Sequence, residues 1–278
     1  MDWNRAKNYT IILLLILNVL LLGLNLSEYA DRGLSGTEVS NITTVLENNG
    51  ISVETDIPRG AENLPQLTLS AEGYNLFELV DIFFEPNVSV KRTEEFNVTI
   101  FKAGNETLRV NDRTAMYTNG DIKAESMEEA EKIASEYMET FDDFFPGFKY
   151  EHSQGLENGY KIEYNMYYKG NNCFNNICIF EFGKSGMNLK LKYSEPLSFT
   201  GIKSEVYSAD IILYSFMNNI NNMYPDESFT ITEITLGYYD ESEGGNSQEE
   251  ALPCYRIRTA EKDESYYING YTGSVSSD

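Results

Sequence analysis

An apolar run of 18 residues, Tyr9–Leu26, is the feature that most constrains this chain. It contains no charged residue, and it follows a polar segment that carries Arg5 and Lys7. At about 1.5 Å per helical residue, such a run is long enough for a hydrocarbon core of roughly 30 Å. Basic residues next to a membrane helix stay on the cytoplasmic side. The pattern predicts a cytoplasmic tail at 1–8, a transmembrane helix at 9–26 and an extracytoplasmic segment that begins at Ser27.

A cleaved signal peptide is the alternative interpretation of the same run. Signal peptides have apolar cores of roughly 7–15 residues, followed by a cleavage site with small residues. Here the core is longer, and Asn25–Ala30 contains no clean pair of small residues. The sequence favours an uncleaved anchor, so we expect a single-pass plasma-membrane protein whose C-terminal domain lies outside the cell.

The segment after the apolar run is strongly acidic. Only Asp2, Arg5 and Lys7 are charged before Ser27, so the remainder has 43 acidic and 19 basic residues and a formal charge of −24. This charge argues against nucleic acid as a partner, because phosphates require Lys and Arg. It also argues against an ectodomain that lies flat on anionic lipid. Plentiful Tyr and Phe predict a folded segment, and we interpret the acidity as a solvated surface rather than an acidic binding face.

The first part of this segment, 27–122, predicts an α+β lobe. Ser35-Gly-Thr-Glu38 is a capping-box pattern that starts a helix. Ile51–Asp56 alternates like a strand, and Leu67–Thr118 has mainly β character. Asn75–Phe84 is ambiguous, because its apolar residues fit neither the helical nor the strand period.

The second part contains an internal repeat of a helix, an aromatic-Pro stop and antiparallel strands. The first helix starts at Ser126-Met-Glu-Glu129 and stops before Pro146, and the second covers Ser204–Tyr224 and stops before Pro225. The strand-like runs are Phe148–Glu151, Tyr160–Lys169, Cys178–Phe182 and Leu189–Tyr193 in the first copy, and Phe229–Tyr239, Leu252–Thr259 and Ser265–Asn269 in the second. The repeats occupy 123–203 and 204–278, and the acidic segment 240–250 reads as a mobile loop. The predicted fold class is α+β, with helices packed on antiparallel sheet.

No set of catalytic or metal-binding residues stands out in the sequence. His152 is the only histidine, so it has no second histidine as partner in a metal site or a proton shuttle, and a surface position is its plain interpretation. Three cysteines do not match zinc spacing, and Gly-rich phosphate-binding loops are missing. We expect neither an enzyme nor a cofactor.

Cys173 and Cys178 flank Phe174-Asn-Asn-Ile177, which resembles a hairpin with Asn-Asn at its tip. Such a turn would place the two cysteines opposite each other, where a disulfide can form. Two free thiols are the alternative, and Cys254 has no evident partner.

The apolar run also carries a candidate partner-binding face. Asn18 lies near its centre and Asn25 follows seven residues later on the same helical face, flanked by Leu14, Leu21 and Leu22. An amide in hydrocarbon is costly unless it finds a partner, and interhelical hydrogen bonds contribute roughly 1 kcal/mol. The pattern favours a docking face for another transmembrane helix over a single tolerated Asn.

Three parts of the sequence match a known pattern: Met1-Asp-Trp3 with Lys7 and Ile16-Leu-Asn18, the helix–strand–Pro start at Ser35–Pro58, and the closing Tyr266–Gly273 stretch. In these features the chain resembles the YycI (WalI) family of low-GC Gram-positive bacteria. The closing stretch is similar to PepSY-type modules, so the resemblance implies PepSY- or cystatin-like repeats. It also implies a single-span regulator of the WalK/WalR (YycG/YycF) system, which controls cell-wall metabolism, with the WalK-like sensor histidine kinase and a YycH-like sibling as partners. The family offers no catalytic residues.

Two functions remain open at this point. The first is a regulator that contacts a sensor kinase through its transmembrane helix and ectodomain. The second is a PepSY- or cystatin-like inhibitor or chaperone of an envelope protease, for which the helix is only a tether.

Overall fold

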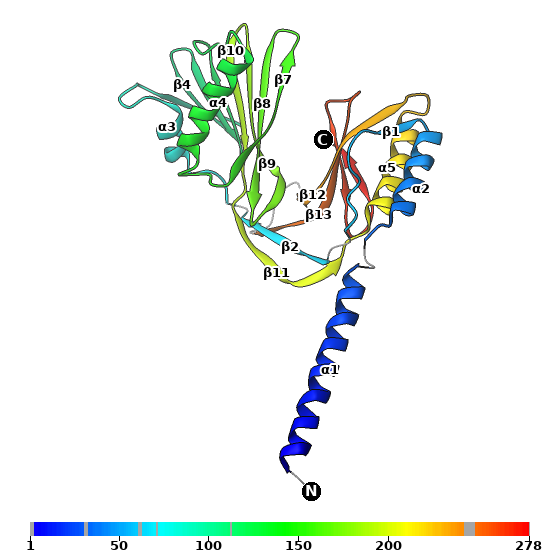
Figure 1. Cartoon of the computed structure of the whole chain (residues 1–278). Helices are drawn as coiled ribbons and strands as arrows, with labels where there is room; N and C mark the ends of the chain where they lie inside the picture. Colours follow the sequence, from blue (N-terminus) through cyan, green and yellow to red (C-terminus); the bar gives the residue numbers. More distant parts are fainter. Residues whose placement is uncertain are drawn as a thin grey trace. The chain divides into compact units, whose positions relative to one another are not determined.

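The computed structural model describes residues 3–30, 33–60, 63–70, 72–111, 113–241 and 248–277. These residues form five helices and fifteen strands (Figure 1). The chain divides into two compact units, each built from separate stretches of sequence. Unit 1 consists of Met1–Leu64, Ser204–Thr235 and Arg256–Asp278, and unit 2 consists of Pro65–Lys203 and Leu236–Tyr255.

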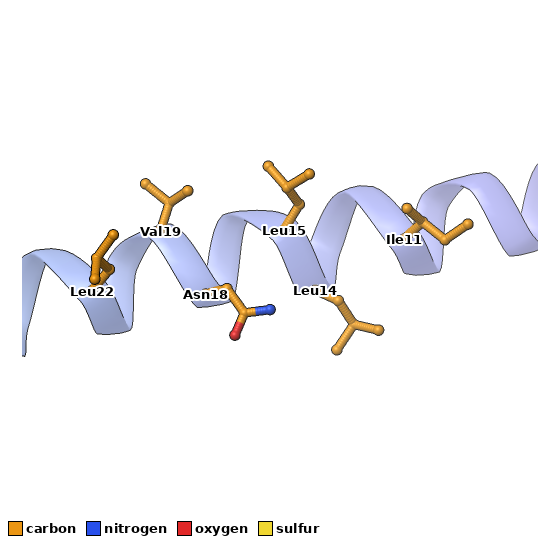
Figure 2. A pocket seen from close by; sticks show the side chains of 6 residues that line it. All are labelled: Ile11, Leu14, Leu15, Asn18, Val19 and Leu22. Carbon is orange, nitrogen blue, oxygen red and sulfur yellow. The ribbon is translucent and has the colours of Figure 1, made fainter.

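Helix α1, Trp3–Ala30, contains the whole apolar run. The exposure of its side chains is described for Lys7 and for Thr10–Leu22, all of which are exposed (Figure 2). Met1 and Asp2 lie outside the described residues, as does the side chain of Asn25. Within the described part of the chain, no helix combines the length and the apolar character of a membrane span.

Unit 1 begins with the helix that the first capping box predicts. Helix α2 covers Gly36–Asn48, and its N-cap Ser35 exchanges hydrogen bonds with Glu38. The Ser35 N–H donates to Glu38 Oε2 at 2.8 Å, and the Glu38 N–H donates to Ser35 Oγ at 3.3 Å. Strand β1, Ile51–Val53, follows and is shorter than predicted.

The remaining elements of unit 1 form a sheet with two helices. The sheet order is β1-β12-β13-β14-β15, and β1 runs parallel to β12 from the pair Ile51 and Phe229. Helix α5 contacts α2 as well as β14 and β15. Phe216 of α5 and Tyr266 of β14 pack edge to face, with ring centroids 5.3 Å apart. The bounds are β12 Phe229–Tyr239, β13 Gln248–Thr259, β14 Ser265–Asn269, β15 Val275–Ser277 and α5 Ala209–Met223.

Unit 2 is built on one large, mostly antiparallel sheet. Its strand order is β11-β2-β13-β12-β9-β10-β6-β5-β4-β3, and β8 and β7 extend from β9. Strand β12 pairs with β9 in parallel, through Gly237 and Tyr238. The bounds are β2 Asn63–Ser70, β3 Lys91–Glu95, β4 Val98–Ala103, β5 Glu106–Asn111, β6 Thr114–Asn119, β7 Phe148–Leu156, β8 Gly159–Tyr168, β9 Asn171–Gly183, β10 Gly186–Lys192 and β11 Pro196–Glu205.

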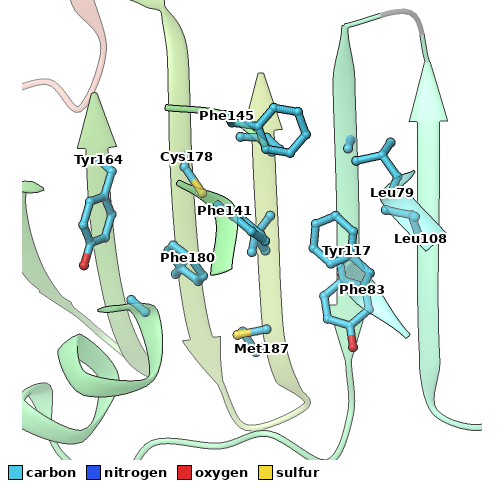
Figure 3. Packing of buried hydrophobic residues seen from close by; sticks show 14 of the residues in the cluster. Leu79, Phe83, Leu108, Tyr117, Phe141, Phe145, Tyr164, Cys178, Phe180 and Met187 are labelled. Carbon is cyan, nitrogen blue, oxygen red and sulfur yellow. The ribbon is translucent and has the colours of Figure 1, made fainter. Parts of the chain in front are cut away.

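Two helices pack on one face of this sheet and close an aromatic core (Figure 3). Helix α3, Leu76–Phe83, resolves the ambiguous segment, because the Asn75 side chain caps it by accepting the Phe77 N–H. Helix α4, Met127–Phe141, starts at Ser126 as predicted. Phe83 of α3 stacks on Tyr117 of β6 at 4.8 Å between ring centroids. The core therefore joins local helices to distant strands, which is the α+β arrangement expected from the sequence.

The predicted hairpin at Cys173–Cys178 is wrong. Both cysteines lie in the single strand β9, and the thiols are free and buried. Cys173 lies opposite Met166 of β8 and Cys178 lies opposite Tyr164, so residues between the two cysteines bulge out of the strand pairing. The Asn-Asn pair is instead an irregularity within β9, where the pairing with β8 shifts register.

The two asparagines at this irregularity bind backbone groups of other segments. The Asn175 amide N–H donates to the Asp240 carbonyl at 2.9 Å, and the Asp240 N–H donates back to Asn175 Oδ1 at 2.6 Å. Asn176 forms the same two-way pair with Ser194, at 2.8 Å in both directions. Each side chain thus bonds a backbone N–H and a backbone carbonyl, as a neighbouring strand would do in regular pairing.

The compact units differ from the predicted lobes. Residues 65–122 and 123–203 belong together in unit 2, and the predicted lobe 27–122 is divided between the units after Leu64. The boundary between 203 and 204 coincides with a predicted one. The difference arises because β2, β11, β12 and β13 each contribute residues to both units, through pairings that are distant in sequence. Of the predicted loop at 240–250, residues 242–247 lie outside the described part.

Candidate functional site

One face of α1 carries a shallow groove between apolar side chains. Figure 2 shows its six side chains, with Leu14 and Asn18 along one edge and Leu15 and Val19 along the other. The spacing of three and four residues places them all on one helical face. The lining residues are Ile11, Leu14, Leu15, Asn18, Val19 and Leu22.

The groove contains three of the five predicted partner-binding residues. Leu14, Asn18 and Leu22 line it, whereas Leu21 is exposed but does not. Asn25 belongs to α1, but its side chain lies outside the described residues. Ile11, Leu15 and Val19 were not predicted, although their helical spacing relative to Asn18 would have identified them.

Asn18 is the only polar residue in the lining of this groove. None of the described residues exchanges a hydrogen bond with its amide. Leu14 and Leu22, which lie about one helical turn before and after it, are more than half exposed. An amide offers two donors and one acceptor oxygen. In an apolar setting these groups favour a partner helix that brings complementary polar atoms to the same depth.

The side chains of His152, Cys173 and Cys178 are held within the fold. His152 is partly buried, and its Nε2 lies 3.9 Å from Oε2 of the buried Glu163, which Lys161 Nζ approaches at 3.7 Å. Burial raises the pKa of the Cys173 thiol to about 12 and that of Cys178 well above its ordinary value. Such thiols stay protonated and are poor nucleophiles. Among the described residues, no cluster of His, Cys, Asp or Glu is placed to hold a metal ion.

Comparison with known proteins decides the family. The model of the YycI protein family matches residues 33–271. The chain belongs to the YycI family. For this YycI-family protein, membership implies a membrane-associated regulator of the WalK/WalR system, in a family that is regulatory and not known to be catalytic. A comparison with curated proteins gave no significant match.

Two solved structures resemble this YycI-family chain. An uncharacterized protein from Eubacterium rectale aligns with a TM-score of 0.55 and 11% identity, over 86% of this chain and 98% of that one. Its similarity shows a shared fold only. The C-terminal domain of Bacillus megaterium YpeB aligns with a TM-score of 0.41 and 10% identity, over 74% of this chain and 98% of that one. That score is too low to support an argument, so the PepSY- or cystatin-like character of the repeats stays a prediction.

Proposed function

We propose that this protein is a membrane-anchored extracytoplasmic regulator of a WalK-like sensor histidine kinase, and that the groove on α1 is its main contact with the kinase. The observation that carries the proposal is the position of Asn18. It is a single amide within an apolar helical face, in a chain of a family that regulates this kinase system.

The anchor role proposed for α1 rests on the sequence of its apolar run, Tyr9–Leu26. The 28 residues of α1 extend about 42 Å, which exceeds a hydrocarbon core of roughly 30 Å. Its described apolar residues from Ile11 to Leu22 are at least half exposed, as expected for side chains that face lipid or another helix. Arg5 and Lys7 assign the N-terminus to the cytoplasm and the two folded units to the outside of the cell.

The folded units then act as a binding module next to the kinase and a YycH-like sibling. Their three cysteines are buried, and their partly buried histidine lies 3.9 Å from the Glu163 carboxylate. Binding, without a chemical step, accounts for these features. Regulation would follow if the regulator binds one state of the kinase more tightly than the other.

Replacing Asn18 with Leu should weaken the complex with the full-length kinase about fivefold, because one interhelical hydrogen bond of roughly 1 kcal/mol is lost. Quantitative co-purification from membranes measures this effect. The combined change Asn18→Leu and Leu20→Asn keeps the composition but moves the amide to the other side of the helix, and should not restore binding. Leu20→Ile is the matched silent control. Unchanged recovery of Asn18→Leu, or full recovery with the relocated amide, would show that the groove is not the contact.

A further inference from the structure

The face of the unit 2 sheet opposite α3 and α4 concentrates basic side chains. Leu108 and Tyr117 point into the core beneath the helices, so their neighbours in each strand point away from it. We call this outward surface the basic sheet face. It consists of Lys91 on β3, Lys102 on β4, Arg109 on β5, Met116 on β6, and Lys190 and Lys192 on β10.

The strand register brings these residues together. Lys91 is directly opposite Lys102 on the neighbouring strand. Arg109 is directly opposite Met116, and Met116 is directly opposite Lys190. Neighbouring strands lie about 4.8 Å apart, so Arg109 and Lys190 are separated by about 10 Å with the methionine between them.

Basic residues outnumber acidic ones on this face, which Glu95 of β3 and Glu181 of β9 share. None of the five basic residues takes part in an ion pair within the described part of the chain, whereas Lys161, Arg256 and Lys262 each do. The chain has 44 acidic and 21 basic residues, so a carboxylate neighbour would be the common arrangement. Like charges directly opposite each other also destabilise a sheet, which applies to Lys91 and Lys102. The face therefore carries a net positive charge that an anionic partner would neutralise.

The centre of the face is apolar. The Met116 side chain is 52% exposed, and the exposed cations Arg109 and Lys190 lie on either side of it. Thr118 and Asn188 adjoin it and share a hydrogen bond of 3.1 Å. An apolar centre within a charged, hydrogen-bonding rim is the anatomy of a protein–protein interface, and a phosphate polymer would not need the methionine.

We propose that the basic sheet face binds an acidic surface with an apolar centre on the extracytoplasmic domain of a partner protein in the kinase complex. This inference rests on the proposed function, since it assumes a membrane complex with other extracytoplasmic domains. It adds a second contact that is independent of α1. Charge complementarity sets the partner's chemistry, and Met116 sets the position of its apolar contact.

The test uses the full chain in nanodiscs of neutral lipid. The probes are the separate extracytoplasmic domains of the WalK-like kinase and of the YycH-like sibling. Neither probe contains a membrane helix, so α1 cannot contribute to binding. The variant Lys102→Glu with Lys190→Glu reverses two exposed charges on the face. The matched control, Lys123→Glu with Lys132→Glu, makes the same charge change at exposed positions near and within α4.

At least one probe should bind the wild-type chain, and added salt should weaken that binding. The face variant should raise the dissociation constant at least about tenfold, and the control should leave it unchanged. Failure of both probes to bind, or equal losses in variant and control, would overturn the inference. It would also be overturned if the wild-type chain bound inorganic polyphosphate or a second copy of itself in place of the probes. If Asn18→Leu still weakens the complex with the full-length kinase when any of these outcomes is seen, the basic sheet face is rejected as a contact. The contact through α1 is then unaffected.

Discussion

Glu233→Gln should destabilise the protein by about 3 kcal/mol, because the buried Arg256 guanidinium loses its ion pair with the Glu233 carboxylate. The Arg256 side chain is 2% exposed, and its Nη2 and Nε lie 2.6 and 3.0 Å from Glu233 Oε1. The Thr235 hydroxyl donates to the same oxygen at 2.7 Å, and Arg258 Nε lies 3.7 Å from the other. Urea denaturation followed by circular dichroism measures the free energy of unfolding.

The matched control is an exposed pair in the same unit. Lys262 Nζ lies 3.0 Å from Glu227, whose side chain is 49% exposed. Glu227→Gln should cost less than about 1 kcal/mol, as is usual for surface ion pairs. Equal losses in the two variants would show that burial of the Glu233 pair does not determine its contribution.

The same pair gives stability a defined pH dependence. Burial raises the pKa of Glu233, but Arg256, the Thr235 hydroxyl and Arg258 outweigh burial and hold it below its ordinary value. A carboxyl with a lowered pKa in the folded state contributes stability that is full above its unfolded pKa and is lost as pH falls through the folded pKa. The difference between wild type and Glu233→Gln should therefore shrink in acid.

Asn176→Ala should cost about 3 kcal/mol, the second large effect, because two buried backbone groups of Ser194 lose their partner. Asn176 is 1% exposed and Ser194 is 5% exposed, so water cannot easily replace the amide. Asn171→Ala, on the same strand, removes only a bond of 3.4 Å to the Lys169 carbonyl and should change stability by less than about 1 kcal/mol. Urea denaturation measures the free energy of unfolding of both variants. Equal values would show that the two Asn176–Ser194 hydrogen bonds contribute no more than the Asn171 bond.

Local signals in the sequence predicted most of the elements. Ser35 and Ser126 start helices as expected, because an N-cap hydrogen bond joins residues only three apart. The second repeat helix begins later than predicted, since Ser204 and Glu205 complete strand β11 and Ser208 takes the N-cap position. Strand propensity and helix propensity compete at such a junction, and the pairing of β11 with a distant strand decides the outcome.

Non-local contacts limited the rest of the prediction. The strands that enter both units pair with partners far away in sequence, so no local pattern defines the units. Asn175-Asn176 was read as a turn, because Asn favours turns and its backbone-binding partners lie elsewhere in the chain. For the candidate site the sequence was sufficient to find Asn18, since a polar residue within an apolar run is visible without a structure.

Strand β12 also combines a local signal with a feature that depends on contacts distant in sequence. Phe229, Ile231 and Ile234 are buried, so the inward face changes phase along the strand. The change precedes the point after Thr235 where the strand passes from unit 1 to unit 2. The phase change was visible in the sequence, but its relation to a unit boundary required the fold.

In the proposed function α1 is an interaction surface and not only an anchor. The most direct test replaces residues 9–26 with an unrelated single-span helix of the same length and follows WalR-dependent transcription in cells. Regulation should be lost while the folded units stay at the outer surface at wild-type levels. Retained regulation with the unrelated helix would contradict this role of α1, and would favour a tethered inhibitor or chaperone of an envelope protease.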